Sequence, residues 1–569
     1  MVGSYEEAVA KVTAPGQLFE ITPVEVGGVG YRVFTYAPPT LRQVFDSARM
    51  QGERTFIVYE GERWSFAEVM RHVDALGAAL VARYGVRKGD RVAIGMRNLP
   101  EWVIAFAAIL SVGAISVSLN AWWTEEELAY ALQDSGASVL IADPERVTAT
   151  RLAAERLGVA TIAVRTPEGT LPPAVDRYEE VVHLGDPLPE VPIEPDDDAT
   201  ILYTSGTTGE PKGAVSTHRA VVQALFAFGC GVAIAREREV AASPGEAAGT
   251  GSPTGLLPGE QPAFILIVPL FHVTGCVPVM LSCFYLGMKL VMMYKWDPEA
   301  ALELIERERV TNFVGVPTQS WDLLESPRFA DFDTSSLISV GGGGAPAPPK
   351  LVRRVEDSFT RGRPQIGYGL TETNAYGPGN SGADYLAHPD STGRAVPIME
   401  VEVRDDDGRA LPAGARGEIW LKGPNLIRGY WGKPDATAEA LVDGWLRTGD
   451  VGHLDDEGFL YIEDRAKDVV LRGGENVYSA EVEAAIYEHP AVYEAAVFGV
   501  PHERLGEEVV AVVQLKPGQS LTAEELQAHV RRRLAAFKVP SKVVFVDHQL
   551  PRSASGKILK RELRAAMFA

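Results

Sequence analysis

Helical periods and short β-branched runs alternate through the first two-thirds of the chain, and this alternation constrains the fold more than any other feature. Residues 65–84 have the spacing of an amphipathic helix, whereas residues 91–96 and 139–142 have the composition of buried strands. Strands that alternate with helices usually form a largely parallel sheet covered by those helices. The sequence therefore predicts an α/β fold.

With 569 residues the chain is longer than one compact core usually accommodates, and its character changes near Asp464. Two helical patterns and two strand-like runs follow that point. They cover residues 477–489, 495–500, 509–515 and 526–536. We expect a large N-terminal domain of layered α/β subdomains, residues 1–464, and a small mobile α+β domain, residues 465–569. Residues 240–262, rich in Gly, Pro and Ser, are expected to form a mobile surface insertion.

Acidic residues outnumber basic residues, 76 against 54, so the formal net charge is −22 at pH 7. A surface of this sign repels nucleic acid and anionic membranes. An anionic ligand must then be bound locally, by backbone N–H groups and a few placed Lys or Arg side chains. We expect small-molecule ligands and no nucleic-acid partner.

Cysteine usage and hydropathy both favour a cytoplasmic protein. Cys230, Cys276 and Cys283 lie in apolar sequence, and an odd, irregular set predicts buried reduced thiols rather than disulfides or a metal site. Residues 102–119 carry no charge and approach membrane-spanning length, but Gly113 interrupts them and β-favouring residues follow. A buried helix followed by a core strand explains this run better, so we expect no membrane span and no signal peptide.

The sharpest local signal is a segment rich in glycine and hydroxyl groups that follows the apolar run at residues 199–202. It reads Tyr203-Thr204-Ser205-Gly206-Thr207-Thr208-Gly209-Glu210-Pro211-Lys212-Gly213. Closely spaced glycines let backbone N–H groups approach phosphate oxygens, hydroxyls add donors, and Lys212 adds a positive charge. The segment lacks the ending of a Walker loop, and a plain surface turn of similar composition is the alternative.

This segment resembles the phosphate loop of the adenylate-forming superfamily, which contains acyl-CoA synthetases, peptide-synthetase adenylation domains and beetle luciferases. Further motifs of that superfamily follow in the same order, and the resemblance extends from about Leu41 to the end of the chain. One short motif is weak evidence, but an ordered series is specific. The resemblance implies ATP with Mg²⁺ and, in acyl-CoA synthetases, coenzyme A.

Two motifs resemble the part of the site that holds the acid. The segment Pro269-Leu270-Phe271-His272-Val273-Thr274-Gly275 is similar to one whose histidine lies close to the reacting carboxylate. The segment Gly341-Gly342-Gly343-Gly344-Ala345-Pro346 is similar to one whose backbone lies against adenine and along the acyl pocket. A satisfied core histidine and a flexible loop are the alternatives. The resemblance implies an acyl pocket formed by His272, Val273, Cys276, Gly341, Gly342 and Ile366.

The segment Gln365-Ile366-Gly367-Tyr368-Gly369-Leu370-Thr371-Glu372 is similar to the superfamily's adenine and magnesium motif. There the tyrosine stacks on adenine, the threonine contacts the α-phosphate, and the glutamate holds the metal, here with Thr204. The chemistry requires such groups, because attack of a carboxylate on the α-phosphate joins two anions. A solvated carboxylate is the alternative for Glu372.

Thr448-Gly449-Asp450 and Asp464-Arg465 resemble the ribose-binding pair, because a carboxylate accepts both ribose hydroxyls at once. The resemblance implies that residues from several of these motifs contact the nucleotide. They are Thr204, Ser205, Gly206, Thr207, Thr208, Gly209, Lys212, Gly343, Gly344, Ala345, Pro346, Gly367, Tyr368, Gly369, Leu370, Thr371, Asp450, Arg465 and Lys557.

Three segments after Asp464 resemble segments of the superfamily that change position between the two half-reactions. Lys467 falls at the superfamily's hinge, about which the small domain turns between adenylation and thioester formation. Arg472, Gly473, Gly474 and Glu475 resemble the loop that lines the CoA tunnel. The segment Leu550-Pro551-Arg552-Ser553-Ala554-Ser555-Gly556-Lys557 resembles the one whose lysine acts in adenylation only. A solvated tail lysine does not fit this context.

The implied activity is that of an ATP-dependent carboxylic acid:CoA ligase, with Lys557, Glu372, Thr204 and His272 as catalytic residues. A stand-alone enzyme that loads a carrier protein, a luciferase-type oxidase and a non-catalytic nucleotide sensor are the alternatives. Long-chain enzymes of the superfamily can carry a gating tryptophan shortly after the histidine, where this chain has Cys276. We therefore expect a medium-chain fatty, aryl or alicyclic acid, and a homodimer as the quaternary state.

Overall fold

The computed structural model describes residues 4–568, apart from residues 168, 170, 173, 205–209, 243–259, 346, 466–467, 473–474, 503 and 554–555. Several predicted site residues therefore lie outside the described residues. These are Ser205, Gly206, Thr207, Thr208, Gly209, Pro346, Lys467, Gly473 and Gly474. Most of the predicted insertion at residues 240–262 also lies outside them.

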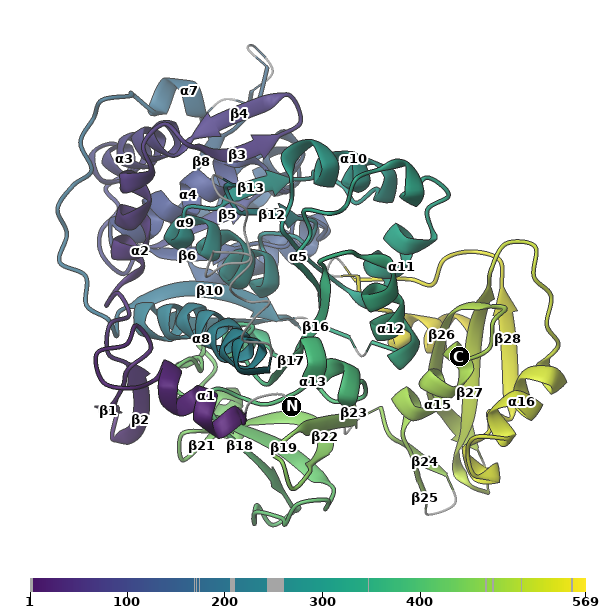
Figure 1. Cartoon of the computed structure of the whole chain (residues 1–569). Coiled ribbons are helices and arrows are strands. Elements are labelled where there is room, and N and C mark those ends of the chain that lie inside the picture. The colour runs from purple at the N-terminus through teal and green to yellow at the C-terminus, as the bar shows by residue number, and fades with distance from the viewer. Residues whose placement is uncertain are drawn as a thin grey trace.

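Two eight-stranded sheets with parallel centres form the large part of the molecule (Figure 1). The parallel strands of the first are β10 (Asp198–Thr204), β6 (Ile115–Ser118), β5 (Arg91–Gly95), β7 (Val139–Ala142), β8 (Ala160–Ala163) and β9 (Val175–Arg177). Strands β11 (Lys212–Thr217) and β20 (Gly429–Tyr430) extend its β10 edge in antiparallel pairing.

The second sheet repeats this design. Its parallel strands are β16 (Arg363–Gly367), β15 (Ser339–Gly343), β14 (Asn312–Gly315), β12 (Ala263–Leu266), β13 (Lys289–Met292) and β3 (Thr55–Tyr59). Antiparallel β17 (Gly379–Ser381) and β4 (Glu62–Ser65) form its edges. The predicted α/β fold with a largely parallel sheet is confirmed, and it is present twice.

Helices cover these sheets, and one of them is buried along its whole length. This is α4 (Pro100–Ser111), which packs with α2 (Leu41–Ala48) and α3 (Phe66–Ala82) in a core shared with both sheets. Strand β6 follows it, so residues 102–119 are a buried helix and a core strand, as predicted. On β5, Val92 and Ile94 face this core, whereas Ala93 faces a second core against α5 (Glu125–Ser135) and α6 (Pro144–Leu157).

The other helices of the large part are shorter or more peripheral, except for one long helix. They are α1 (Tyr5–Val12), α7 (Tyr178–Val181), α8 (His218–Ala242), α9 (Ser282–Leu286), α10 (Pro298–Glu308), α11 (Pro317–Glu325), α12 (Pro349–Ser358), α13 (Gly382–Ala387) and α14 (Pro434–Ala440). Among the described residues, α8 alone is long and apolar enough to cross a membrane, by length and composition only. Its apolar window is 61% buried inside the protein.

A five-stranded antiparallel sheet completes the large part and leads to the small unit. Its strands are β18 (Glu400–Arg404), β19 (Gly417–Lys422), β21 (Leu441–Val442), β22 (Trp445–Leu454) and β23 (Leu460–Arg465). A separate hairpin, β1 (Ile21–Val26) and β2 (Val29–Phe34), lies near the N-terminus.

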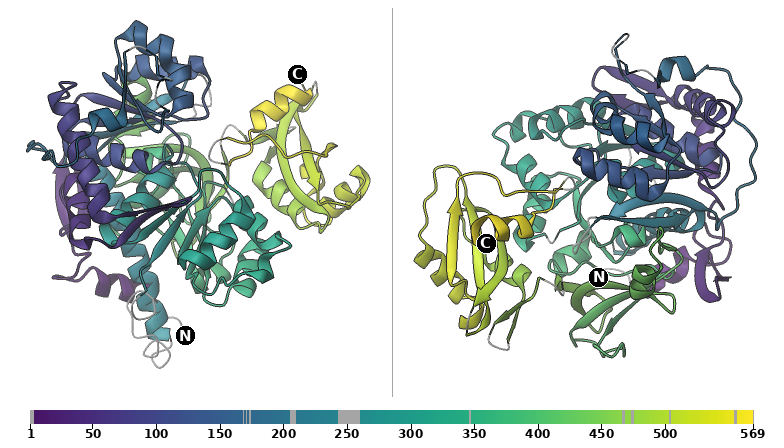
Figure 2. Two further views of the ribbon diagram at one scale, coloured as in Figure 1. Left: turned by 90° about the horizontal axis from the view of Figure 1, so that it is seen from above. Right: turned by 180° about the vertical axis from the view of Figure 1, so that it is seen from behind.

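The small unit has its own sheet and its own apolar core. Its elements are β24 (Val470–Arg472), β25 (Glu475–Val477), α15 (Ser479–Tyr487), β26 (Val492–His502), β27 (Gly506–Leu515), α16 (Ala523–Arg531), β28 (Lys542–Val546) and α17 (Lys560–Phe568). It lies to one side of the large part in both views of Figure 2. Helix α16 begins before the predicted residues 526–536, because Thr522 and Glu525 form a capping box, and it ends at Arg531.

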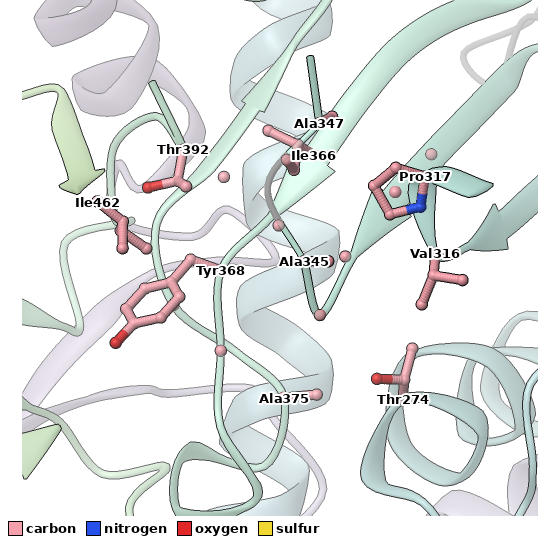
Figure 3. A pocket seen from close by; sticks show the side chains of 18 of the residues that line it. Thr274, Val316, Pro317, Ala345, Ala347, Ile366, Tyr368, Ala375, Thr392 and Ile462 are labelled. Carbon is pink, nitrogen blue, oxygen red and sulfur yellow. The ribbon is translucent and has the colours of Figure 1, made fainter. Parts of the chain in front are cut away.

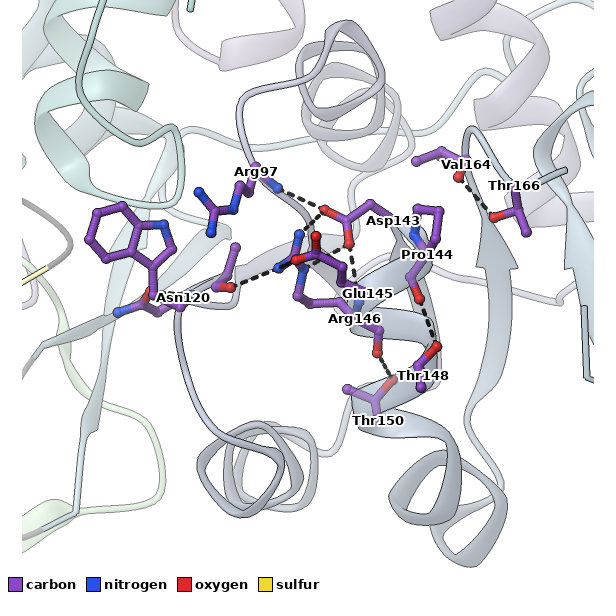
Figure 4. A network of polar contacts seen from close by, with 12 residues as sticks. Arg97, Asn120, Asp143, Pro144, Glu145, Arg146, Thr148, Thr150, Val164 and Thr166 are labelled. Atoms are coloured by element: carbon purple, nitrogen blue, oxygen red, sulfur yellow. Dashed lines mark hydrogen bonds and ion pairs between the residues drawn. The ribbon is translucent and has the colours of Figure 1, made fainter. Parts of the chain in front are cut away.

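A buried ionic network fixes the carboxyl ends of three strands of the first sheet (Figure 4). Asp143, which follows β7 and caps α6, accepts from the backbone N–H of Arg97 beyond β5 at 3.1 Å. Arg146 donates through Nε to Asp143 at 2.7 Å and through Nη1 to the carbonyl of Ala121 beyond β6 at 3.1 Å. The Arg146 and Asp143 side chains are only 6% and 5% exposed, so each depends on the other for charge compensation.

Replacing Arg146→Ala leaves the buried Asp143 carboxylate without its guanidinium partner. We expect the free energy of unfolding to fall by about 3–5 kcal/mol. The matched control is Arg151→Ala on the same helix, whose pair with Glu155 is 3.2 Å long and about half exposed, 45% and 55%. That change should cost less than about 1 kcal/mol. Urea unfolding followed by circular dichroism measures both, and equal losses would contradict the role given to the buried network.

Candidate active site

A connected cavity of about 2460 Å³ is lined by both large sheets, the five-stranded sheet and the small unit. Figure 3 shows part of it, with Tyr368 and Thr392 on one side and Thr274, Val316 and Pro317 on the other. The structure brings most of the described predicted residues to this cavity. They are Thr204, Lys212, His272, Val273, Gly341, Gly342, Gly343, Gly344, Ala345, Ile366, Gly367, Tyr368, Gly369, Leu370, Thr371, Glu372, Asp450, Arg465 and Lys557.

The three residues assigned to adenine and ribose form one hydrogen-bonded group. Asp450 in β22 and Arg465 in β23 are register partners, and Arg465 Nε lies 2.8 Å from Asp450 Oδ1. Tyr368 Oη donates to Asp450 Oδ2 at 2.5 Å. Burial and the Asp450 carboxylate raise the pKa of the Tyr368 phenol, so it stays a donor. The carboxylate is therefore held in a fixed orientation at the cavity wall.

Glu372 is held by a side chain from the first sheet. Tyr430 Oη donates to Glu372 Oε1 at 2.7 Å, and burial together with this carboxylate raises the pKa of Tyr430. Lys212 Nζ lies 5.2 Å from the centre of the same tyrosine ring. Because β20 pairs with β11, the sheet places Tyr430 beside the strand that begins at Lys212, and Thr204 is the register partner of Lys212. One tyrosine thus connects the predicted metal carboxylate and phosphate-loop cation.

His272 is partly buried at the cavity wall, and its ring is neutral. Burial, and then the charge of Lys557, lower its pKa from 6.5 to about 4. The backbone N–H of Thr274 donates to His272 Nδ1 at 3.3 Å, so the neutral ring carries its proton on Nε2. The ring can therefore donate a hydrogen bond to a carboxylate without adding charge to the site.

Glycine is required where the two units meet. Gly344 has φ +76°, and a Cβ built there would lie 3.4 Å from Cε of Lys557. Gly556, just before that lysine, has φ +86°, and its Cβ would lie 2.9 Å from Val316 Cγ2. Both positions favour glycine for conformation, and the second also for space. The segment that carries Lys557 is thus packed closely against the large part.

Three predicted positions are not brought to the cavity. Cys276 is fully buried in the apolar core, and Thr274 and Pro278 line the cavity beside it instead. The prediction that Cys276 faces the acyl pocket therefore does not agree with the lining. Arg472 forms an ion pair with Glu508 at 3.0 Å, and neither Arg472 nor Glu475 lines the cavity in this orientation of the small unit.

Two contacts of the site were not foreseen from the sequence. Tyr430 carries no motif of its own, and only the pairing of β20 with β11 places it beside Glu372. Thr448 accepts from the backbone N–H of Asp450 at 3.1 Å and donates to the carbonyl of Ile419 at 2.7 Å. The Thr-Gly-Asp triplet was the only sequence signal for this second residue.

The donor set fits a nucleotide with a magnesium ion. Mg²⁺ usually takes one or two protein carboxylates and completes its shell with phosphate oxygens and water. Glu372 offers such a carboxylate, already oriented by Tyr430, and the Thr204 hydroxyl lies at the start of the predicted phosphate loop. Such an ion would neutralise charge on the phosphates.

Two family models match the chain. The model of the AMP-binding enzyme matches residues 44–431, and that of the AMP-binding enzyme C-terminal domain matches residues 481–557. A feruloyl-CoA synthase of Amycolatopsis sp. is 39% identical over 91% of this chain and 96% of its own length. A long-chain-fatty-acid–CoA ligase of Bacillus subtilis is 34% identical over 92% of this chain and 94% of its own.

Solved structures give the same result. The o-succinylbenzoate CoA synthetase MenE of Bacillus subtilis, in complex with its acyl-adenylate intermediate, has a TM-score of 0.76 and 30% identity over 92% of this chain and 98% of its own. A second structure of that enzyme, with ATP and a magnesium ion, has a TM-score of 0.75 and 30% identity over 92% of this chain and 99% of its own. The similarity covers both units.

The neutral state of His272 can be tested by its titration. Because its folded pKa is about 4 and the ordinary value is 6.5, the folded protein binds fewer protons than the unfolded protein between these values. The free energy of unfolding therefore falls as the pH falls from 6.5 to about 4. We expect NMR of ¹³C-labelled histidine to show a neutral ring until about pH 4, and Lys557→Ala to raise that pKa only partly, because burial is the larger cause. Titration near 6.5 in the unmodified protein would contradict this account.

Proposed function

The chain belongs to the AMP-binding enzyme family, and on that premise we propose which residues carry its reaction and which class of acid it takes. The protein is an AMP-forming carboxylic acid:CoA ligase, with ATP and CoA as co-substrates and Mg²⁺ accompanying ATP. A carboxylate oxygen attacks the α-phosphorus of ATP and pyrophosphate leaves. The CoA sulfur then attacks the acyl carbon and AMP leaves.

The observation that carries the residue assignment is that Lys557 and His272 line the same cavity from different units. Lys557 comes from the small unit, yet it lies close enough to His272 of the large part to lower its pKa. Lysine contributes the positive charge and neutral His272 contributes a donor at Nε2. Together they offset and orient the two anions that must approach each other in the first step. Glu372 and Thr204 are assigned to the magnesium ion, and Tyr368, Asp450 and Arg465 to the nucleoside.

The domain assignment of residues 1–464 and 465–569, with Lys467 as hinge, is part of this proposal. Strand β23 ends at Arg465 within the five-stranded sheet, and β24 begins at Val470 in the sheet of the small unit. The orientation seen here has Lys557 at the cavity and Arg472 away from it, which suits adenylation. Thioester formation then requires the small unit to turn and bring the residue 472–475 loop to the acyl-adenylate.

We assign the substrate to ring-bearing acids, with aryl acids first. A Cβ at Gly342 would have Gly315 O, at 3.9 Å, as its nearest atom, and a Cβ at Gly367 would meet nothing within 4 Å. The cavity is thus open beside these two glycines, and Val316, Pro317 and Ile366 add uncharged side chains to its lining (Figure 3). Such a slot suits a planar ring. The similarity to a feruloyl-CoA synthase supports this choice over a medium-chain fatty or alicyclic acid.

A cytoplasmic location and a homodimeric state complete the proposal. The three cysteine thiols are free and buried, as suits a reducing compartment. Light scattering on the purified protein measures its mass in solution, and fractionation of the source cell measures its location.

A panel of aryl, alicyclic, medium-chain and long-chain acids, assayed for pyrophosphate release with and without CoA, tests the substrate assignment. We expect kcat/KM for aryl acids to exceed that for long straight acids by about tenfold or more. Gly342→Ala, whose Cβ would have Gly315 O at 3.9 Å as its nearest atom, should lower kcat/KM for aryl acids about tenfold and leave short straight acids within about twofold. A preference for long straight acids, or release of about one equivalent of pyrophosphate unaffected by CoA, would contradict the proposal.

Lys557→Ala tests the catalytic assignment through the two half-reactions. We expect acyl-adenylate formation to fall by about a hundredfold or more, because the cation that offsets the developing charge is gone. Thioester formation from supplied acyl-adenylate and CoA should stay within about twofold of the unmodified enzyme. Rapid-quench measurement of each half-reaction separates them, and an equal fall in both would contradict a role confined to adenylation.

A further inference from the structure

Helix α11 of the large part contacts the small unit through a hydrogen bond that crosses between them. Asp322 on α11 accepts from Trp296 Nε1 at 2.9 Å through one carboxylate oxygen, within the large part. Its other oxygen accepts from Tyr493 Oη at 2.7 Å, and Tyr493 belongs to β26 of the small unit. Figure 1 shows that the β26 side of the small unit faces α11 and α12. Asp322 is therefore oriented by Trp296 of the large part and binds Tyr493 of the small unit.

Two further contacts involve the same helix. Lys516, which follows β27, forms an ion pair with Glu325 at 2.5 Å, and its ammonium lies 5.8 Å from the centre of the Trp321 ring. Arg552 Nη1 lies 3.5 Å from Thr318 Oγ1. These contacts involve one face of α11, because residues three or four positions apart lie on the same face of a helix. The residues are Thr318, Trp321, Asp322 and Glu325. The small unit thus rests on a continuous face of this helix.

This face is connected to the lysine of the first half-reaction. Arg552 donates to the carbonyl of Gly556 at 2.7 Å, next to Lys557, and pairs with the buried carboxylate of Glu494. Glu494 is the neighbour of Tyr493 in β26, and it also accepts from the backbone N–H of Leu550 at 2.8 Å. Tyr493 and the Lys557 segment are therefore held together by one buried carboxylate.

We infer that α11 is the docking element of the small unit for adenylation, and that Asp322 and Tyr493 are positioning residues that hold Lys557 at the reacting centre. The inference rests on the proposed role of Lys557. Tyr493 also lines the cavity, but the hydrogen bonds of both side chains go to Trp296 and to each other rather than to Tyr368, Asp450 or Arg465, so we assign their effect to the orientation of the small unit. Because the second half-reaction requires that orientation to be left, the Asp322–Tyr493 bond aids the first half-reaction only.

Tyr493→Phe removes only the hydroxyl that crosses the interface. We expect acyl-adenylate formation to slow about tenfold in kcat, the size of a hydrogen bond to a charged group, with little change in KM for ATP. Thioester formation from supplied acyl-adenylate and CoA should be unchanged or faster. Tyr84→Phe is the matched control, because Tyr84 Oη donates to Asp176 Oδ2 at the same 2.7 Å but within the large part. It should leave both half-reactions within about twofold.

A conservative and a disruptive change at the partner complete the test. Asp322→Asn keeps an acceptor for Tyr493 and should retain most of the adenylation rate, whereas Asp322→Leu should be at least as slow as Tyr493→Phe, because it also removes the bond from Trp296. The double variant Asp322→Leu, Tyr493→Phe should be no slower than Asp322→Leu alone, because the Asp322–Tyr493 bond is already lost in that single variant. Equal loss in both half-reactions, or additive losses in the double variant, would overturn the inference. Lys557→Ala in the same assays reports separately on the role of the lysine, so failure of the two proposals can be told apart.

Discussion

The approach of Lys557 to the glycine-rich turn at Gly344 is the constraint on which the proposed site depends, because a Cβ at Gly344 would lie 3.4 Å from Lys557 Cε. On the proposed mechanism a cation must reach a centre where two anions react, and Lys557 would supply it from a unit with its own apolar core. The lack of a side chain at Gly344 leaves room for Lys557, and the lack of one at Gly556 leaves room for Val316. The Asp450 group and Glu372, with the side chains that orient them, all lie on the large part.

The electrostatics follow from the same requirement. The protein carries a net charge of −22, so anionic ligands gain nothing from its long-range field. Binding depends instead on local groups whose charge state is fixed by burial. Protonated Tyr368 and Tyr430 donate hydrogen bonds without adding charge, and the low pKa of His272 keeps its ring neutral. Lys212, Arg465 and Lys557 are among the cations that line the cavity.

The sequence predicted what depends on local pattern and on motif order, and missed what depends on pairing between distant segments. Alternating patterns gave the parallel α/β layers, and motif order gave nineteen residues that line one cavity. Tyr430 became part of the site only because the two-residue strand β20 pairs with β11. Cys276 was placed in the pocket by proximity to His272, but it lies in the π-helix Gly275–Leu281 and is buried in the core. Neither fact has a signature in a single sequence.

The wall of the acyl pocket and the dock of the small unit share one stretch of chain. Val316 lines the cavity and packs against Gly556, and the helix that carries Asp322 begins at the next residue, Pro317. A bound acid that presses on Val316 therefore acts on the segment carrying Lys557 and on the start of α11 together. Since packed side chains have little room to move, a poorly fitting acid displaces the lysine as well as itself. On the proposed roles of the acyl pocket and of Lys557, selection of the acid and delivery of the cation would be coupled, and discrimination would then be expressed in the rate of adenylation as well as in binding.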